Sequence, residues 1–282
     1  RHHRRLMPRT GRRAGQLEKA DPMTTIPLYQ LDAFTDRPFG GNPAAVCILH
    51  DWLDDATLQA IAVENNLSET AYLVADGDNF KLRWFTPGME VDLCGHATLA
   101  SAALVLDHLQ PGRKVVAFET KSGTLTVKRD GDKLAMDFPA RSAEEVPLPE
   151  GFEAATGVVP ERFLRAQKNM AVLADEAAVL AFDPDLDYIK NMQGMGLIVT
   201  APGGESDCAS RYFAPHAGIP EDPVTGSAHC TIVPYWVARL GKNEIYARQV
   251  SARGGDLYCR LDGDRVVMAG YAIMVLEGRL TI

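Results

Sequence analysis

Two segments of this chain share a pattern that constrains its fold more than any other feature of the sequence. Residues 83–87 read RWFTP and residues 211–215 read RYFAP, so both follow the form R-aromatic-F-x-P. Each is followed by a glycine that begins an apolar segment, at Gly95 and at Gly226. A coincidence between two strand-loop-helix units is the alternative, but the shared order favours two related halves.

The segments after these glycines are predicted to be buried helices. Nine of the fifteen residues 95–109 are Ala, Leu or Val, and residues 227–240 are largely apolar. A helix that is apolar on every side must be buried on every side. A third helix is predicted over residues 56–65, with Asp54 or Asp55 as its N-cap. Short strands bounded by turn residues account for the rest: 28–35, 70–75, 80–85, 115–119, 124–128, 133–138, 170–173, 197–200, 208–213 and 266–276.

We therefore predict an α+β (α/β) protein of two pseudo-repeated domains, each a mixed β-sheet wrapped around a central apolar helix. A length of 282 residues is sufficient for two domains. The Pro- and Glu-rich stretch 139–151 is the best candidate for a linker. We place the domains at residues 23–140 and 141–282, and leave open that the C-terminus supplies the closing strand of the first domain.

The first 22 residues differ from the rest of the chain in charge. They carry seven Arg or Lys and two acidic residues, so the net charge of −8 for the whole chain leaves −13 for residues 23–282. We expect residues 1–22 to be a disordered basic tail, a vector-derived segment or the product of an upstream start, because a transit peptide would contain serines and an apolar face. The acidic remainder argues against a nucleic-acid partner, since phosphate binding requires clustered Lys and Arg.

The cysteines and the hydropathy indicate a cytoplasmic protein. The five cysteines are scattered, odd in number and without CxxC spacing, which favours reduced thiols over a disulfide framework or a zinc site. No apolar run approaches the ~18 residues of a membrane span, so no membrane partner is expected. No phosphate-binding glycine motif follows a strand, and we predict neither a metal nor another cofactor.

The two helix starts are the predicted position of the chemistry. The first N–H groups of a helix lack intrahelical partners, and the helix dipole places partial positive charge there. Two such ends facing one cleft would bind a carboxylate. Polar residues gather beside them, namely Asp92, Cys94 and His96 at the first and Glu221, Asp222, Thr225 and Ser227 at the second.

Glu69 is the candidate acid/base group, because a single carboxylate in a desolvated cleft has a raised pKa and can transfer protons. Simpler interpretations stay open at this point: Glu69 as a solvated loop residue, Asp222 as a turn cap and His96 as a hydrogen-bonded helix residue. The remaining histidines, among them His216, are interpreted as surface or structural residues.

Four segments resemble one known family in the expected order. They are FTDRPFGGNPAAV (34–46), NLSETAYL (66–73), LCGHATLA (93–100) and EDPVTGSAH (221–229). Together they resemble the PhzF-like (phenazine biosynthesis-like) family, which shares the two-domain fold of diaminopimelate epimerase. The resemblance extends from about Ile26 to the C-terminus.

The resemblance implies a cofactor-independent isomerase, a homodimer, that moves a proton on a small cyclic or amino carboxylate. It implies Glu69 as the general acid/base, with His96 and Asp222 completing the catalytic set. The residues that we expect to bind the substrate are Gly41, Asn42, Ser68, Gly95, Ala97, Thr225, Gly226 and Ser227.

Three alternatives remain. A racemase or epimerase that resembles diaminopimelate epimerase would use two cysteines, but the turn at residues 222–226 offers no partner for Cys94, so such an enzyme would have to oppose Cys94 to a carboxylate, Glu69 or Asp222. A non-catalytic protein could bind a small carboxylate, although a nearby Glu69 would not help it to do so. A hydrolase pair of Ser227 and His229 is disfavoured, because side chains two residues apart on a helix point to different sides.

Overall fold

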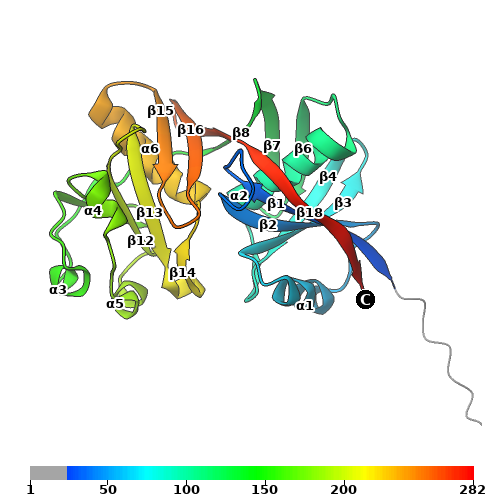
Figure 1. Cartoon of the computed structure of the whole chain (residues 1–282), viewed down its shortest axis with the longest axis horizontal. Coiled ribbons are helices and arrows are strands. Elements are labelled where there is room, and N and C mark those ends of the chain that lie inside the picture. Colours follow the sequence, from blue (N-terminus) through cyan, green and yellow to red (C-terminus); the bar gives the residue numbers. More distant parts are fainter. Residues whose placement is uncertain (1–23) are drawn as a thin grey trace, which may run out of the picture.

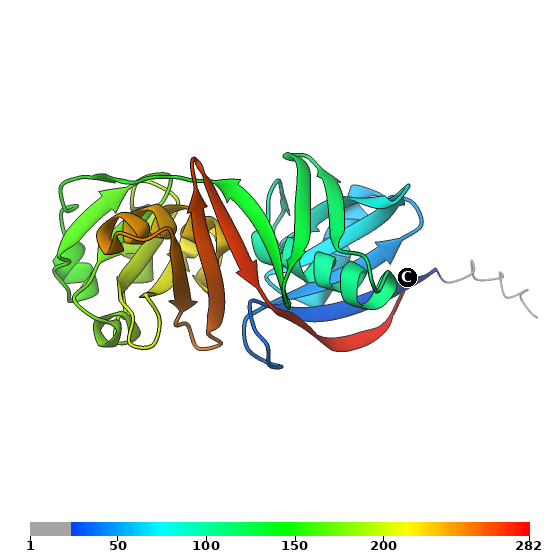
Figure 2. The ribbon, with the colours of Figure 1, turned by 90° about the horizontal axis from the view of Figure 1, so that it is seen from above.

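The computed structural model describes residues 24–282, so the predicted basic tail of residues 1–22 lies outside the described residues. Two lobes lie side by side along the long axis of the molecule (Figure 1). The view from above shows the chain passing between the lobes along β8 and again from β17 into β18 (Figure 2). β8 and β17 are themselves paired antiparallel, so the two lobes share a continuous sheet.

The sheet of the first lobe follows the order β18–β1–β2–β3–β4–β6–β7–β8, with the short β5 beside β4. The strands are β1 (Thr25–Ala33), β2 (Asn42–Leu49), β3 (Glu69–Asp76), β4 (Asn79–Phe85), β5 (Glu90–Val91), β6 (Val115–Thr120), β7 (Gly123–Asp130), β8 (Lys133–Pro139) and β18 (Ala272–Thr281).

The sheet of the second lobe follows the order β9–β10–β11–β12–β13–β15–β16–β17, with β14 beside β13. The strands are β9 (Glu144–Glu145), β10 (Arg162–Arg165), β11 (Asn169–Val172), β12 (Leu197–Pro202), β13 (Cys208–Ala214), β14 (Ile219–Asp222), β15 (Glu244–Gln249), β16 (Gly255–Asp262) and β17 (Arg265–Gly270).

The pairing pattern of the two lobes is the same. β2–β3 and β11–β12 are parallel, as are β4–β6 and β13–β15. The pairs β3–β4, β4–β5, β12–β13 and β13–β14 are antiparallel. The repeated R-aromatic-F-x-P segments lie at the ends of β4 and β13, which are equivalent strands. The predicted fold class of two pseudo-repeated α+β units is therefore confirmed.

A buried helix fills each lobe, as predicted. α2 (Gly95–Ala103) continues as the π-helical segment η1 (Leu104–Leu109), so the predicted helix 95–109 has the right extent but changes its winding near the end. Every residue of α2 from His96 onward is buried. α6 (Gly226–Leu240) begins one residue before the prediction. Both helices pack in the main core cluster, which spans the two lobes.

Shorter helices cover the outer faces. α1 (Asp55–Asn65) starts where the sequence indicated, because Asp54 Oδ1 accepts a hydrogen bond from Thr57 N at 3.0 Å. The remaining short helices escaped the sequence analysis: α3 (Phe152–Thr156), α4 (Glu176–Leu180), α5 (Leu186–Asn191) and the 3₁₀ turn η2 (Pro215–Ala217).

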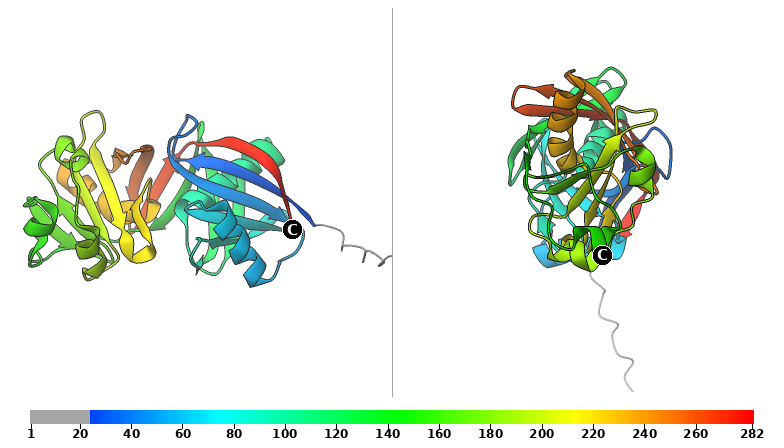
Figure 3. Two further views of the ribbon diagram at one scale, coloured as in Figure 1. Left: turned by 60° about the horizontal axis from the view of Figure 1, so that its bottom comes forward. Right: turned by 90° about the vertical axis from the view of Figure 1, so that its left-hand side faces the viewer.

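The C-terminal strand belongs to the sheet of the first lobe. β18 pairs antiparallel with β1 along its length, from Ala272 opposite Ala33 to Thr281 opposite Thr25. Figure 3 shows the two strands side by side at one edge of that lobe. The domain limits at residues 140 and 141 remain a prediction.

Two further findings concern the cysteines and the membrane. All five cysteines are buried and free of disulfide bonds, as their scattered spacing predicted. Within residues 24–282, none of the helices has both the length and the apolar character that crossing a membrane requires.

The turn between β1 and β2 is bound to the second lobe through Arg253. The guanidinium donates to the carbonyls of Gly40 and Gly41 at 2.7 and 2.8 Å, and to Asp32 Oδ1 at 2.8 Å. Gly41 N in turn donates to Gly254 O at 2.8 Å. Asp32 is 1% exposed, so the charge of Arg253 compensates a carboxylate that water cannot reach. These bonds fix the start of β2, where Asn42 stands.

Gly41 and Gly77 provide a matched test of this turn. Both adopt left-handed backbone conformations, with φ of 59° and 60°. A Cβ at position 41 would lie 2.1 Å from Ala33 O, whereas at position 77 it would meet nothing within 4 Å. We expect Gly77→Ala to lower the free energy of unfolding by about 1 kcal/mol, and Gly41→Ala to lower it by about 3 kcal/mol or more.

Urea denaturation of both variants and the parent protein measures the two differences. Similar losses for the two variants would show that the backbone angle alone matters at position 41, and would contradict the close approach of this turn to β1.

Candidate functional site

The two buried helices meet at their N-termini, glycine against glycine. A Cβ built on Gly95 would lie 3.7 Å from the Cα of Gly226, and one built on Gly226 would lie 3.8 Å from the Cα of Gly95. The residues before them, Cys94 and Thr225, do not cap their helices with side-chain hydrogen bonds. The positive ends of both helix dipoles are thus directed at one place between the lobes.

A cavity of about 200 Å³ lies at this junction. Its walls include both helix starts, with Gly95 and His96 from the first lobe and Gly226 and Ser227 from the second. Glu69 lines it too, from the first position of β3. The cavity is therefore made by both halves of the chain, and its size suits a small ligand.

Glu69 and His96 face each other in this cavity. Glu69 Oε2 lies 3.0 Å from His96 Nε2, and the two side chains are only 12% and 6% exposed. The atoms are too poorly aligned for a well-formed hydrogen bond, and both are left without a hydrogen-bonding partner among the described residues. Buried polar atoms are normally paired. This unpaired couple is therefore available to a ligand in the cavity.

The opposite side of the imidazole is held by Cys94 and Asn42. His96 Nδ1 lies 3.5 Å from Cys94 Sγ and 3.2 Å from Asn42 Nδ2. The two N–H groups of Asn42 already point to Asp222 Oδ1 at 2.7 Å and Val224 O at 2.9 Å. In the neutral imidazole, Nδ1 would accept the Cys94 thiol proton and Nε2 would carry the proton, whereas in the imidazolium both nitrogens carry one. In either state we assign an N–H group to Nε2, towards Glu69.

Burial opposes a charge on His96, but the acidic groups of Cys94 and Glu69 act in the other direction and raise its pKa above the usual value. Burial, with a smaller contribution from Glu69, raises the pKa of the Cys94 thiol. Cys94 is therefore a poor source of thiolate, whereas His96 is a suitable donor to the carboxylate beside it.

Asp222 is the second carboxylate of the cavity. Burial is the main cause that raises its pKa to about 6, with Glu69 adding to the rise and His96 opposing it. Thr225 Oγ1 donates to Asp222 Oδ2 at 2.6 Å. Asp222 therefore changes its protonation state close to neutral pH, which suits proton transfer.

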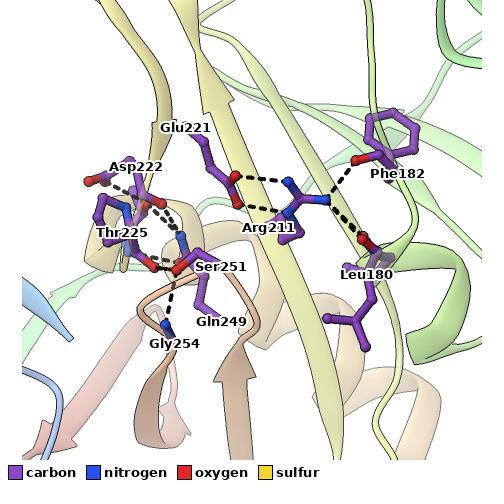
Figure 4. A network of polar contacts seen from close by, with 11 residues as sticks. Leu180, Phe182, Arg211, Glu221, Asp222, Thr225, Gln249, Ser251 and Gly254 are labelled. Atoms are coloured by element: carbon purple, nitrogen blue, oxygen red, sulfur yellow. Dashed lines mark hydrogen bonds and ion pairs between the residues drawn. The ribbon is translucent and has the colours of Figure 1, made fainter. Parts of the chain in front are cut away.

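A network of polar contacts fixes the turn that carries Asp222 (Figure 4). Gln249 Nε2 donates to Asp222 O at 2.7 Å, and its Oε1 accepts from Thr225 N at 2.8 Å. On the other side, Arg211 forms two hydrogen bonds with Glu221, at 2.7 and 2.8 Å, and a third with Phe182 O at 2.6 Å. The turn is thus bound at both ends before any ligand enters.

The structure brings most of the predicted site residues together. Seven of them line the cavity: Glu69, Gly95, His96, Asp222, Thr225, Gly226 and Ser227. Four do not line it: Gly41, Asn42, Ser68 and Ala97. The carbonyl of Gly41 accepts a hydrogen bond from Arg253, and the side chain of Asn42 contacts His96 and Asp222 from outside the cavity. Gly41 and Asn42 therefore position other groups of the site.

Several cavity residues escaped the sequence analysis. His216, interpreted as a surface or structural residue, is exposed but lines the cavity from η2. Arg141 and Lys168 also line it, from the crossover after β8 and from the turn before β11. Neither belongs to a motif, so no sequence signal distinguished them. Tyr212 could have been found, because it is the aromatic residue of the second repeated segment.

Glu69, Cys94 and His96 also constitute a possible metal-binding set. One ligand atom from each lies within 4.8 Å of the other two. A carboxylate, a thiolate and an imidazole are donors that zinc accepts. The prediction that no metal takes part stays a prediction, and no step below depends on an ion.

Comparisons with known proteins agree on one family. A profile of the PhzC-PhzF family, described as "Phenazine biosynthesis-like protein", matches residues 31–278. An uncharacterized isomerase of Pseudomonas aeruginosa is 48% identical over 255 residues, which are 90% of this chain and 98% of the relative. The crystal structure of a PhzF-family phenazine biosynthesis protein from Enterococcus faecalis has a TM-score of 0.89 at 42% identity, covering 91% of this chain and 99% of that one.

A more distant neighbour shows the breadth of the fold. The hydroxyproline epimerase of Agrobacterium vitis has a TM-score of 0.61 at 9% identity, with 92% of this chain and 93% of that one covered. At this identity the likeness concerns the fold alone, and it agrees with the predicted epimerase-like architecture.

The raised pKa of Asp222 predicts a stabilising substitution. The pKa of the Asp222 carboxyl is about 6 in the folded state, against an ordinary value of 3.8, so the folded protein is less stable when this group is ionised than when it is protonated. Its ionisation costs stability progressively as the pH rises from about 4 to about 6, reaching roughly 3 kcal/mol above that range. We expect Asp222→Asn to be more stable than the parent protein at pH 8, and the difference to shrink towards pH 4. Urea denaturation across this range measures it, and a difference independent of pH would contradict the assignment.

Proposed function

The chain belongs to the PhzC-PhzF family of phenazine biosynthesis-like proteins, and on that premise we propose that it is an isomerase that moves a proton on a small carboxylate, with Glu69 as the acid/base group. Relatives named isomerases support the general class. The carboxylate substrate and the role of Glu69 rest on the arrangement of the cavity.

One observation carries the proposal. Glu69 Oε2 and His96 Nε2 are buried, 3.0 Å apart and without hydrogen-bonding partners, in a cavity between two helix N-termini. Catalytic hydrogen bonds are often poorly aligned without substrate and tighten when it binds. The Glu69 carboxylate lies beside one donor, His96 Nε2, without a well-formed hydrogen bond to it, and is therefore available as a base.

The helix starts would hold the carboxylate of the substrate. Unpaired N–H groups at Gly95 and Gly226 and the hydroxyl of Ser227 offer donors, and the dipoles of α2 and α6 favour negative charge there. Removal of a proton from a neighbouring carbon sends electron density towards this carboxylate. The same donors therefore stabilise the charge that develops as the C–H bond breaks.

Glu69 would take that proton and return it to a different carbon. The breaking C–H bond leaves its electron pair on the substrate, and the proton is held on Glu69 until a new C–H bond forms. His96 Nε2–H orients the carboxylate before transfer and is positioned by Asn42 and Cys94. Asp222, with its pKa of about 6, would supply or accept a second proton. A small cavity keeps these protons from exchanging freely with water.

A thiol mechanism has less support. Burial raises the pKa of Cys94, and it also raises the pKa of Cys230 to about 11. Thr225, which precedes the second helix, occupies the position equivalent to Cys94. Two opposed thiolates are therefore not available. The homodimer and the cytoplasmic location stay predictions.

Glu69→Gln tests the proposal. The parent protein is incubated with small cyclic and amino carboxylates in deuterated water. NMR and mass spectrometry then measure isomerisation of each compound and deuterium uptake at its carbon atoms. Because the amide cannot act as a base, we expect the rate to fall by about 10²–10⁴-fold, while ligand binding persists. Cys94→Ser, which keeps a donor towards His96 Nδ1, should retain a rate close to that of the parent protein.

The control separates the two mechanisms. A loss in Cys94→Ser as severe as that in Glu69→Gln would revive the thiol mechanism. An unchanged rate in Glu69→Gln would refute the role of Glu69. Ligands that bind the cavity and never exchange a proton would favour a binding protein instead.

A further inference from the structure

Two basic side chains in the cavity have no role in the chemistry proposed above. Arg141 and Lys168 both line the cavity, and both come from segments of the second half of the chain. Lys168 is 5% exposed, whereas Arg141 is partly buried. Lysine is almost never buried to this degree without a partner. The reason for its burial therefore requires an explanation.

No acidic group of the described residues pairs with either cation. Within residues 24–282 the ammonium of Lys168 and the guanidinium of Arg141 form no hydrogen bond, and no carboxylate oxygen lies within 4.0 Å of either. Cys230 and, to a smaller extent, Asp222 act to raise the pKa of Lys168, and neither does so through a hydrogen bond. Both oxygens of Asp222 already accept hydrogen bonds, from Asn42 and Thr225.

Tyr212 holds Lys168 in place without neutralising it. The ammonium lies 5.3 Å from the centroid of the Tyr212 ring, within the range of a cation–π contact. The ring is itself fixed, because Tyr212 Oη donates to Met195 O at 2.6 Å. The chain thus directs the ammonium to the cavity while leaving its three donors free.

The charges of the pair repel each other. Burial lowers the pKa of Lys168, and the positive charge of Arg141 lowers it further. His216 lies on the same side, and burial together with the charge of Lys168 lowers its pKa as well. Like charges gathered in a poorly solvated place are costly unless an anion joins them. This wall of the cavity therefore has the properties of an anion-binding site.

We propose that Arg141 and Lys168 form a second anion-binding subsite, and that the protein acts on a small dicarboxylate. One carboxylate would lie at the N-termini of α2 and α6, and the other would bind Arg141 and Lys168. The forked guanidinium suits the two oxygens of a carboxylate. A cavity of about 200 Å³ admits only a compact ligand between the two positions. This inference rests on the proposed function for the first carboxylate.

Two probes of equal chain length test the subsite. Glutarate carries a carboxylate at each end, whereas pentanoate carries a methyl group in place of the second. Isothermal titration calorimetry on the full chain should give glutarate an affinity at least about tenfold higher than that of pentanoate, as expected for a buried charge pair. If the parent protein binds glutarate and pentanoate equally well, or binds neither acid, the proposal is overturned.

Lys168→Met keeps the apolar stem and removes the charge. We expect it to lose the preference for glutarate and to bind pentanoate within about twofold of the parent protein. Lys190→Met, which alters an exposed lysine at the end of α5, is the matched control and should keep the preference. Should Lys168→Met fail to fold, Arg141→Gln at the more exposed position takes its place. Equal weakening of both acids would show that Lys168 has a structural role only.

Glu69→Gln distinguishes failure of this inference from failure of the proposed function. This variant should keep the preference for glutarate while proton transfer is lost. If proton transfer survives in Glu69→Gln and the preference still depends on Lys168, the isomerase mechanism fails and the subsite stands. If proton transfer depends on Glu69 but Lys168→Met binds glutarate as the parent protein does, the mechanism stands and the subsite fails.

Discussion

The contact between the first turns of α2 and α6 determines much of the structure around it. Two positive helix ends repel each other, yet their backbones lie close together at Gly95 and Gly226, where a Cβ on either glycine would lie 3.7 or 3.8 Å from the Cα of the other. The surrounding sheets hold the helices in this position, because each helix is enclosed by its own lobe and the lobes share the β8–β17 pairing. An anion between the helix ends would relieve the repulsion, so the architecture favours a negatively charged ligand at the point where the lobes meet.

The two lobes repeat their topology but not their chemistry. Equivalent strands carry equivalent structural ion pairs, Arg83 with Glu90 between β4 and β5 and Arg211 with Glu221 between β13 and β14. At the helix starts the equivalents diverge: His96 in one lobe corresponds to Ser227 in the other. The symmetric scaffold thus provides paired helix dipoles, while one lobe supplies the imidazole and Glu69 and the other supplies Asp222. Such asymmetry lets one substrate meet different groups on its two sides.

The sequence predicted the parts of the site that depend on local order. The glycines at 95 and 226 follow repeated segments, and the helices after them are apolar on all sides, so their burial and their starts could be predicted. Contacts between distant segments could not. Arg141 and Lys168 reach the cavity only because the crossover after β8 and the turn before β11 lie beside it, and no motif marks them. The sequence predicts that Gly41 and Asn42 bind the substrate, whereas in the structure Arg253 of the other lobe fixes this turn and Asn42 supports Asp222 from outside the cavity.

The position of β18 has a consequence for the order in which the chain can fold. β1 is made first, yet one of its two neighbours, β18, comes after the whole second lobe. While the chain emerges from the ribosome, the first lobe therefore has an open edge at β1 throughout the synthesis of the second. An open strand edge is a site of mispairing with other chains. Domains usually fold in the order of their synthesis. Here the lobe that is synthesised first is the one that is completed last.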